Sequence, residues 1–502
     1  METRASSPIS HREALRKAEQ SIAKAKDAVS KDLHRLKYHF MAPAYWINDP
    51  NGLIFFKGEY HLFYQHYPYA PQWGAMHWGH AKSKDLVHWE HLPIALAPSE
   101  PYDNHDRGGC FSGSAVDDNG TLSLLYTGTM IQEDGKVVQT QCLATSQDGI
   151  TFEKYEGNPV ISAPPEDGSA DFRDPKVWRH NDLWYMVVGS GKDGEGKALL
   201  YKSANLREWD YVGVLAESDG RIGTMWECPD FFPLGDRYVL MFSPMGMGHH
   251  KTIYLVGDMD YETGKFTWDQ MGDIDHGFDY YAPQSFLDGK GRRIIIAWLN
   301  NWDWMPWYKD FGPTYQNNWC GAMSFPRTVE LEPDGRLKFS PVEELQVLRR
   351  EHVHLGNTKV TPGKSVLPKY VASDCLEIKA EFELAGCKAE EIGFVLRASE
   401  DSTQQTLLSC NLQTKELRFD RSRADGWSEG VQTAKLEAAD DGVLKLHILI
   451  DTSVIEVYTD GDRTVMTNNI YPDPGSVNLD VFTVGNDVVM RSIDIWKLSS
   501  AW

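Results

Sequence analysis

The sequence contains no long hydrophobic run and no paired cysteines. No stretch of 18 or more apolar residues occurs, so no membrane-spanning helix is expected. The first ten residues are polar and lack the apolar core of a secretory signal. Seven cysteines are dispersed without disulfide-like or metal-like spacing, which is typical of reduced thiols. These absences together favour a cytoplasmic protein.

Basic residues are in the minority. The chain has 50 Lys and Arg against 72 Asp and Glu, a formal net charge of −22. Neither a nucleic acid nor an anionic membrane surface is an expected partner for such a charge. Aromatic residues are abundant, with 17 Trp and 22 Tyr. Flat rings of this kind pack on the C–H faces of sugars, although a β-rich core would also contain them.

At 502 residues the chain is too long for one ordinary domain, and its periodicity changes along its length. Residues 12–36 repeat apolar side chains every three or four positions, which predicts an amphipathic helix that braces the rest. From about residue 40, short apolar segments alternate with Gly, Pro, Asn and Asp, which is typical of strands and turns.

One phrase repeats within this β-rich region. It occurs as Ser83-Lys-Asp-Leu-Val-His-Trp89, as Ser146-Gln-Asp-Gly-Ile-Thr-Phe152 and as Ser203-Ala-Asn-Leu-Arg-Glu-Trp209, with a weaker copy in residues 257–266. A repeated unit of this length without a crossover helix indicates four-stranded propeller blades. A β-solenoid is the alternative, but its repeats are normally shorter.

A second series accompanies the first. Asp49, Ser112, Asp174, Glu227 and Asp279 follow one another at steps of 63, 62, 53 and 52 residues. Because the innermost strands of a propeller line its axis, we expect the acidic residues at positions 49, 174 and 227 to meet in one central pocket. The common phase predicts that these three occupy equivalent points of different blades.

The end of the chain has a different pattern. A short helical link is expected over residues 342–351, and residues 376–384, 444–450 and 454–458 alternate apolar with polar side chains, as in a β-sandwich. The predicted fold is all-β: a five-bladed β-propeller followed by a C-terminal β-sandwich, with a short N-terminal helix. The expected domains are an extension over 1–37, a propeller over 38–340, a linker over 341–352 and a sandwich over 353–502.

Three carboxyl groups in one aromatic-walled pocket could catalyse the hydrolysis of a glycosidic bond. Hydrolysis of a glycosidic bond needs one ionised carboxylate to attack, or to activate water, and one protonated carboxyl to assist the leaving oxygen. Mutual repulsion and desolvation both raise carboxyl pKa values, so neighbouring acids can keep a proton near neutral pH.

The motifs around these acids resemble those of the family 32 glycoside hydrolases, which include invertases, sucrose-6-phosphate hydrolases, levanases and inulinases. The three signatures are Trp46-Ile-Asn-Asp-Pro-Asn-Gly52, Arg173-Asp-Pro175 and Glu227-Cys-Pro229. Further matches follow in order: Phe63-Tyr-Gln65, Trp73-Gly74, Phe111-Ser-Gly113, Asn301-Trp-Asp-Trp304, and Ile455-Glu-Val-Tyr458 through Tyr471-Pro472. The resemblance extends over about residues 40–500.

The resemblance implies a role for each acid. Asp49 matches the nucleophile that forms a covalent fructosyl-enzyme, Glu227 the general acid and base, and Asp174 the residue that stabilises the transition state. The expected substrate-binding residues are Asn48, Gln65, Trp73, Phe111, Ser112, Arg173, Tyr281 and Trp302. No cofactor is expected.

Other residues near the motifs have ordinary interpretations as well. His66, His77 and His80 could suggest a metal site, but no carboxylate or cysteine completes a ligand set, so hydrogen-bonded blade residues are expected and no metal. Cys228 adjoins the predicted acid, where it either tunes a pKa or is a simple buried thiol.

The substrate is expected to be a small fructose-containing saccharide, sucrose or sucrose 6-phosphate, handled by a monomer or homodimer. The motifs alone leave open an exo-acting levan or inulin fructosidase. A non-catalytic glycan-binding propeller should lack one of the three acids, and all three are present. The first and third signatures argue against a five-bladed glycosidase for arabinosides or xylosides.

Overall fold

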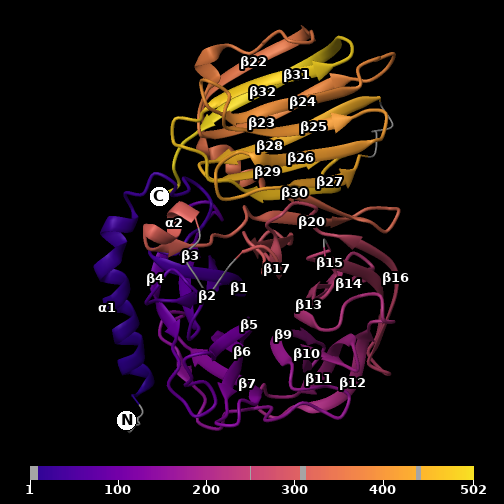
Figure 1. Ribbon diagram of the computed structural model, residues 1–502. Helices are drawn as coiled ribbons and strands as arrows, with labels where there is room; N and C mark the ends of the chain where they lie inside the picture. The colour runs from indigo at the N-terminus through magenta and orange to yellow at the C-terminus, as the bar shows by residue number, and fades with distance from the viewer. Residues whose placement is uncertain (1–8, 249, 306–311, 437–441) are drawn as a thin grey trace.

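The structure is a computed structural model that describes residues 9–248, 250–305, 312–436 and 442–502. Within them, five sheets surround one axis as a β-propeller, and two further sheets form a β-sandwich on its rim (Figure 1). The predicted all-β fold is therefore confirmed, and the alternative of a β-solenoid is excluded.

Each blade is a meander of four antiparallel strands, numbered from the axis outward. In chain order the strands are β1 (Tyr45–Phe56), β2 (Glu59–Tyr67), β3 (His77–Ser83) and β4 (Trp89–Leu96); β5 (Gly109–Asp118), β6 (Thr121–Ile131), β7 (Val137–Ser146) and β8 (Glu153–Lys154); β9 (Phe172–His180), β10 (Leu183–Lys192), β11 (Glu195–Ser203) and β12 (Asp210–Glu217); β13 (Trp226–Leu234), β14 (Arg237–Pro244), β15 (Ile253–Asp260) and β16 (Lys265–Asp273); and β17 (Tyr281–Leu287), β18 (Arg293–Trp298), β20 (Arg327–Leu331) and β21 (Leu337–Pro341).

The repeated Ser-x-Asp/Asn phrase forms the turn between the third and fourth strands of a blade. In the first blade, Asp85 Oδ1 accepts hydrogen bonds from the N–H groups of Val87 and His88, at 3.0 and 2.8 Å. Asp148 and Asn205 accept equivalent pairs of bonds in the next two blades. Such a side chain satisfies backbone donors where the chain reverses, so the period of the sequence is the period of the blades.

The ring is closed by a short strand from the fifth blade. After α2 (Gly312–Gln316), β19 (Trp319–Cys320) pairs in parallel with β1, with Tyr45 opposite Trp319. The first and last blades are therefore joined by backbone hydrogen bonds beside the axis, which fixes the start of β1.

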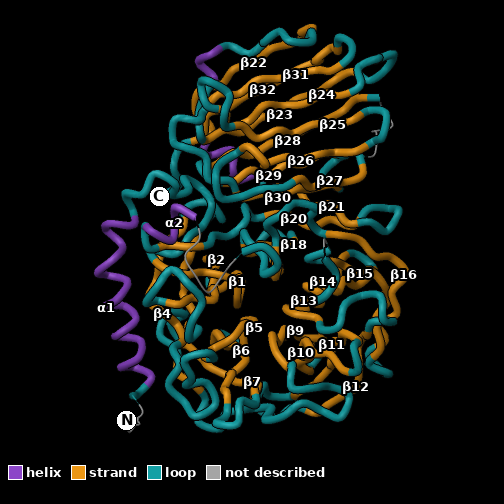
Figure 2. The backbone as a smooth tube through the Cα atoms, in the orientation of Figure 1, coloured by secondary structure: helices purple, strands orange, loops and turns teal. Residues whose placement is uncertain are grey.

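The N-terminal helix α1 (His11–Val29) is shorter than expected and lies against the first blade (Figure 2). Ser10 caps its first turn, because the Ser10 hydroxyl accepts a hydrogen bond from Glu13 N. Glu19 accepts a hydrogen bond from Ile94 N of the outer strand β4 at 2.7 Å. The helix was expected to reach residue 36, but it ends at Val29. The Asp32 side chain accepts bonds from His34 N and the Trp319 indole, which draws the chain away from the helix axis.

The sandwich has one sheet of six strands and one of five. The first contains, in spatial order, β22 (Arg349–Val360), β32 (Val488–Leu498), β23 (Cys375–Glu383), β28 (Val443–Asp451), β29 (Val454–Thr459) and β30 (Thr464–Asn469). The second contains β27 (Val431–Lys435), β26 (Glu416–Arg423), β25 (Gln405–Asn411), β24 (Glu391–Ala398) and β31 (Asn478–Val484), and η2 (Lys369–Val371) precedes β23. The three alternating segments coincide with β23, β28 and β29, as predicted.

The link between the two domains is less helical than expected. A 3₁₀ helix, η1 (Glu343–Leu348), covers its first part, but Arg349 already pairs with Leu498 in β22. An ion pair between Arg349 and Glu377 of β23, at 2.7 Å, holds the chain in the sheet at this point. The expected helix over residues 342–351 is therefore wrong in its last three residues.

Buried charges join the propeller to the sandwich. Arg327 of β20 is inaccessible to solvent and donates to Asp275 of the propeller at 2.9 Å and to Glu456 of the sandwich at 3.1 Å. Burying a cation without partners is costly, so the two carboxylates are what allow this arginine to lie between the domains.

His39 makes a second charged link whose strength depends on pH. Its ring nitrogens contact Asp451 and Glu456 at 3.0 and 3.3 Å. Burial opposes the charged ring, but the two carboxylates raise the pKa of His39 from 6.5 to about 9. Because the folded pKa lies above the unfolded one, the stabilisation is complete below about pH 6.5 and is lost as the pH rises through about 9.

We expect His39→Gln to remove this pH dependence. Between pH 6 and pH 10 the wild type should lose roughly 3 kcal/mol more unfolding free energy than the variant, which is the free energy of a 2.5-unit difference in pKa. Urea denaturation of both proteins at the two pH values measures this difference. Parallel losses in the two proteins would show that the ring is neutral in the folded state.

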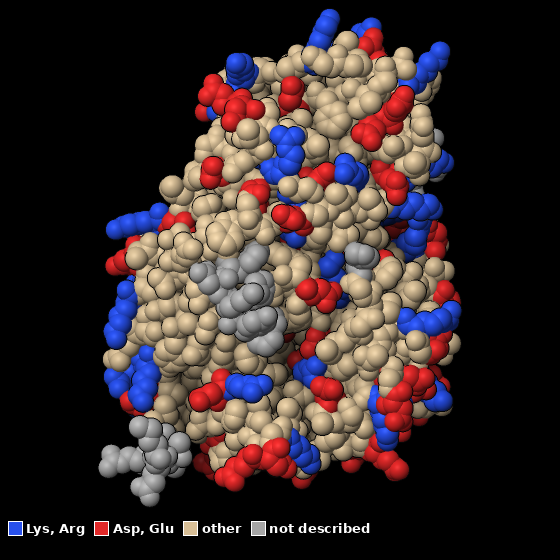
Figure 3. Space-filling view, in the orientation of Figure 1, with Lys and Arg blue, Asp and Glu red and all other residues tan. Residues whose placement is uncertain are grey.

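Acidic and basic side chains are interspersed over the face seen in Figure 3, without a large patch of one sign. Within the described ranges, no helix is both long enough and apolar enough to cross a membrane.

Candidate active site

Each of the five innermost strands is interrupted by an irregularity at the same depth. The register shifts lie between the following pairs of residues: Ile47 and Pro50, Phe111 and Gly113, Arg173 and Lys176, Glu227 and Asp230, and Tyr281 and Gln284. A bulge bends a strand and redirects the side chains next to it. Consecutive residues of a strand, which normally face opposite ways, can therefore both reach the axis.

The bulges also show which residues are equivalent. Asp174, Cys228 and Ala282 each precede a proline and have positive φ angles of 67, 49 and 52°. Glu227 stands one position earlier, where the neighbouring blades have Arg173 and Tyr281. The expectation that Glu227 is equivalent to Asp49 and Asp174 is therefore wrong, because the fourth blade has a cysteine there.

Asp279, the fifth member of the spacing series, does not line the cavity at the axis. Its carboxylate is buried at the boundary with the sandwich, where it forms an ion pair with Arg421 at 2.9 Å. The residue of the fifth blade that corresponds to Asp174 is Ala282. The spacing series had instead given Asp279, which lies three residues earlier and before the bulge.

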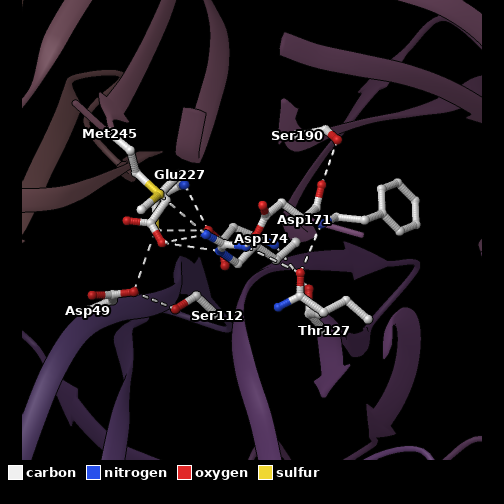
Figure 4. A network of polar contacts seen from close by, with 12 residues as sticks. Asp49, Ser112, Thr127, Asp171, Asp174, Ser190, Glu227 and Met245 are labelled. Atoms are coloured by element: carbon white, nitrogen blue, oxygen red, sulfur yellow. Dashed lines mark hydrogen bonds and ion pairs between the residues drawn. The ribbon is translucent and has the colours of Figure 1, made fainter. Parts of the chain in front are cut away.

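Asp49 lies on β1 and is held by neighbours from two strands (Figure 4). Its Oδ2 accepts a hydrogen bond from Ser112 Oγ at 2.7 Å, and its Oδ1 accepts one from Asn48 Nδ2 at 3.1 Å. Burial raises the pKa of Asp49, the Ser112 bond opposes this, and the charge of Glu227 adds to it. The carboxylate is thus fixed in direction and poorly solvated.

Glu227 lies on β13 between the equivalent residues of the two adjacent blades. Its Oε1 accepts two hydrogen bonds from the Arg173 guanidinium, at 3.1 and 2.9 Å. Its Oε2 accepts one from the Tyr281 hydroxyl, whose own pKa is raised well above the usual value by burial and by the charge of Glu227. Both oxygens are therefore held by donors that are 54 residues away along the chain in either direction.

Asp174 and Cys228 form the deeper layer. Asp174 Oδ2 accepts a hydrogen bond from Cys228 N at 2.9 Å, and the Asp174 backbone N–H donates to Thr127 Oγ1 at 3.0 Å. Burial raises the pKa of Asp174 to about 7, against the effect of Arg173 and with a contribution from Glu227. The Cys228 sulfur lies 3.5 Å from both Asp49 Oδ2 and Asp174 Oδ2.

The thiol therefore contacts the other two acids through its sulfur, and of the two alternatives for Cys228 the simple buried thiol fits its burial. Burial and the charges of Asp174 and Asp49 raise the pKa of Cys228 well above its usual value. The group is a neutral thiol, with its single proton available to either carboxylate.

These acids open into a cavity of about 410 Å³ at the propeller axis. All eleven residues that the sequence suggested lie in its lining: Asn48, Asp49, Gln65, Trp73, Phe111, Ser112, Arg173, Asp174, Glu227, Tyr281 and Trp302. Four of these come from the first blade or from the segment that follows its second strand. The structure thus brings together residues that are more than 250 positions apart in the chain.

Aromatic rings form much of the wall. Trp73 meets Phe111 edge to face, with ring centroids 6.1 Å apart, and Trp302 stacks over Trp46 at 6.2 Å. Gln65 donates to Cys110 O at 2.9 Å, which fixes its amide at the cavity floor. Apolar ring faces beside directed polar groups are the usual composition of a sugar-binding pocket.

Sequence reasoning missed part of the outer lining. The additional residues are Met76, Gln139, Pro244, Met245, Gly246, Met247, Gly248, His250, Lys251 and Asp303. Most belong to the segment after β14, which carries no repeated phrase. Asp303 lies inside the Asn301-Trp-Asp-Trp304 motif and could have been found there.

The three histidines of the first blade are hydrogen-bonded within it. His66 Nδ1 contacts Trp46 O at 2.7 Å, His77 Nδ1 contacts Ala75 O at 2.9 Å, and His80 Nε2 contacts His61 Nδ1 at 3.0 Å. Burial lowers the pKa of His66 to about 4 and that of His77 to about 3. Among the residues that the structure describes, no group of His, Cys, Asp and Glu is arranged to hold a metal ion.

Comparison with known proteins agrees with the motifs. Residues 39–341 match the glycosyl hydrolases family 32 N-terminal domain, and residues 344–497 match the family 32 C-terminal domain. A sucrose-6-phosphate hydrolase of Escherichia coli is 41% identical over 482 residues, which covers 92% of this chain and 94% of that protein. A raffinose invertase of the same organism is 38% identical, with the same coverage of both chains.

Solved structures agree in fold as well. A family 32 β-fructofuranosidase of Bombyx mori superposes with a TM-score of 0.83 at 33% identity, over 98% of this chain and 99% of that one. The sucrose-6-phosphate hydrolase of Lactobacillus gasseri gives a TM-score of 0.84 at 26% identity, over 96% and 97%. With both of its domains matched in order, the chain belongs to glycosyl hydrolase family 32.

Proposed function

We propose that this protein is a β-fructofuranosidase that hydrolyses sucrose or sucrose 6-phosphate, with retention of configuration and through a covalent fructosyl-enzyme. The observation that carries the proposal is the convergence of Asp49 and Glu227 on one cavity, each held by its own hydrogen-bond donors. Two carboxyl groups of this kind are what a retaining glycosidase requires.

In the first step, Asp49 attacks the anomeric carbon of the fructosyl unit and Glu227 gives a proton to the leaving oxygen. Ser112 and Asn48 hold the attacking carboxylate in one orientation, so little reorganisation is needed when the bond forms. In the second step Glu227 takes a proton from water, which attacks the same carbon and releases fructose.

Asp174 stabilises the transition state without forming a bond. It lies beside Asp49 in the deeper layer, where it accepts hydrogen bonds from fructose hydroxyl groups. Three carboxyl groups in one cavity cannot all be ionised without strong repulsion, so the site holds a proton near neutral pH, and the titration belongs to the group as a whole.

The substrate is small. The two Escherichia coli relatives are named for sucrose 6-phosphate and for raffinose, and the cavity volume of about 410 Å³ suits a sugar of that size. We expect kcat/KM to be highest for sucrose and sucrose 6-phosphate, lower for raffinose and lowest for inulin. Equal values for all four would contradict the preference for a small substrate, and no fructose release from any of them would refute the function.

We further propose that the protein is cytoplasmic and is a monomer or homodimer. All seven cysteines are free and six of them are buried, which suits a reducing compartment. Fractionation of the producing cells and sedimentation velocity at micromolar concentration test these two statements.

Ser112→Ala should shift the pH dependence of the reaction. Its hydroxyl donates to the ionised form of Asp49, so its removal raises the pKa of that carboxyl further. If Asp49 must be ionised to attack, the acid limb of kcat/KM moves to higher pH, by up to about one unit for the loss of one bond to a charged group.

Profiles of kcat/KM on sucrose from pH 4 to 8 measure this shift. Ser114→Ala is the matched control, because Ser114 lies two residues further along β5 and its hydroxyl bonds to Pro175 O and Val177 N of the β9 backbone, not to a carboxylate. An acid limb that moves equally in both variants would show that the bond to Asp49 is not its cause.

A further inference from the structure

A second buried arginine crosses from the sandwich to the propeller. Arg421 of β26 donates through Nη1 to Asp279 Oδ2 and to Asn469 O, both at 2.9 Å. Its guanidinium lies over the rings of Phe278, at 3.7 Å, and Trp304, at 4.5 Å. Only 1% of the side chain is exposed. The cation is therefore enclosed by groups of both domains.

Asp279 connects three segments at this point. Its Oδ2 also accepts a hydrogen bond from Asn469 N at 2.7 Å, and its Oδ1 accepts one from Trp304 Nε1 at 2.8 Å. A buried carboxylate with these partners is stable only while the cation beside it remains. Arg421 of the sandwich thus helps to fix two propeller segments, the one that contains Asp279 before β17 and the one that contains Trp304 after β18.

Both propeller segments continue directly into the cavity. Two residues after Asp279, Tyr281 donates to Glu227. Just before Trp304, the side chains of Trp302 and Asp303 lie in the cavity lining. Arg421 itself is not part of that lining. It stands behind the wall and fixes it from outside.

This wall belongs to the outer part of the cavity. Asn48, Asp49 and Asp174 at the floor are buried, whereas Asp303 is exposed and Trp302 is half-buried. On the proposed function, fructose occupies the floor and its glycosidic oxygen faces Glu227. The leaving unit then extends outward, along the wall that the 302–304 segment forms.

We propose that Arg421 is a positioning residue for the leaving sugar. Through Asp279 and Trp304 it holds the wall against which the glucosyl unit of sucrose rests, so the β-sandwich takes part in substrate binding. The inference rests on the proposed function and assigns the sandwich a role beyond packing.

Arg327 provides a matched comparison. It is also a buried arginine that joins a propeller aspartate, Asp275, to the sandwich. Its partners Asp275, Glu456 and Thr467 are all absent from the cavity lining. Replacing it removes a comparable interdomain link. Its guanidinium also lies 4.3 Å from the ring centroid of Tyr280, next to Tyr281 of the lining, so the two variants are compared by the ratio of two substrates and not by absolute rates.

The experiment compares Arg421→Met with Arg327→Met on two substrates, sucrose and methyl β-D-fructofuranoside, which has no glucosyl unit. We expect Arg421→Met to raise KM for sucrose about tenfold, since a wall displaced by a fraction of an ångström weakens positioning. Its kcat/KM on the methyl glycoside should fall by much less, because a displaced Tyr281 affects Glu227 equally for both substrates, whereas only sucrose rests on the wall. Arg327→Met should leave the ratio of the two kcat/KM values unchanged, whatever its effect on thermal stability.

An unchanged ratio in Arg421→Met, or an equal change in both arginine variants, would overturn the inference. If Arg421→Met does not fold, Trp304→Phe decides on the same ratio, because it removes the indole bond to Asp279 and leaves the ion pair in place. A wild type that cleaves neither substrate would overturn the proposed function, and this inference with it.

Discussion

Asp49→Ala is expected to lower kcat on sucrose by at least about 10³-fold while the fold is retained. Neither of the other two acids can take its place, because Asp174 is bound to Cys228 N in the deeper layer and Glu227 is held by Arg173 and Tyr281. The loss should be in kcat, since the residues that bind fructose remain. Initial rates of fructose release, with circular dichroism to confirm folding, measure it.

A small anion should restore part of the activity in this variant only. Removal of the carboxylate leaves space beside Ser112 from which azide can attack the anomeric carbon, and the product is then a fructosyl azide of inverted configuration. Asp174→Ala should also be slow, but it keeps its nucleophile and should form no such product. An Asp49→Ala protein with nearly normal turnover would mean that another group attacks.

The blades were predictable because their turns use a fixed chemistry. Asp85, Asp148 and Asn205 perform the same task at the same point of each repeat, so the repeat is visible in one sequence. Nothing comparable marks the segment after β14. Its lining residues, such as Met247 and Lys251, are placed by the second strand of a single blade and have no counterpart to reveal them.

The exact register of the acidic residues at the propeller axis could not be taken from the repeat. Asp174 is equivalent to Cys228, so Glu227 lies one residue ahead of that position, and an unbroken strand would have pointed it to the opposite face. The bulge between Glu227 and Asp230 is what turns it toward the axis. Bulges depend on the pairing of two strands, and a single strand's sequence does not specify them.

Contacts between the two domains were even harder to predict from the sequence. Asp279 belongs to the predicted series by spacing, yet its partner Arg421 is 142 residues away on the other domain. The same holds for His39 and Asp451, which are 412 positions apart. Each of these residues looks like an ordinary polar side chain until both domains are in place, because its burial is produced by the assembly of the two.

Glu227→Gln tests whether Glu227 is the proton donor, because its effect should depend on whether the leaving oxygen needs a proton. On sucrose, whose leaving oxygen needs protonation, we expect kcat to fall by at least about 10³-fold. The amide keeps the size of the side chain and its oxygen can still accept a hydrogen bond from Tyr281, while its NH2 group faces Arg173 and cannot accept, so we expect the fold to be preserved and only this one contact to be lost. Its defect is the missing proton.

With 4-nitrophenyl β-D-fructofuranoside the first step should be much less affected, because nitrophenolate leaves without a proton. The second step still needs a base to activate water, and the amide of the Glu227→Gln variant cannot supply one. The fructosyl-enzyme on Asp49 should therefore accumulate, and rapid mixing should show a burst of about one equivalent of nitrophenolate followed by slow turnover. Azide, which needs no base, should accelerate the slow phase. If the variant lost equal activity on both substrates and gave no burst, Glu227 would have to act on a step other than departure of the leaving group.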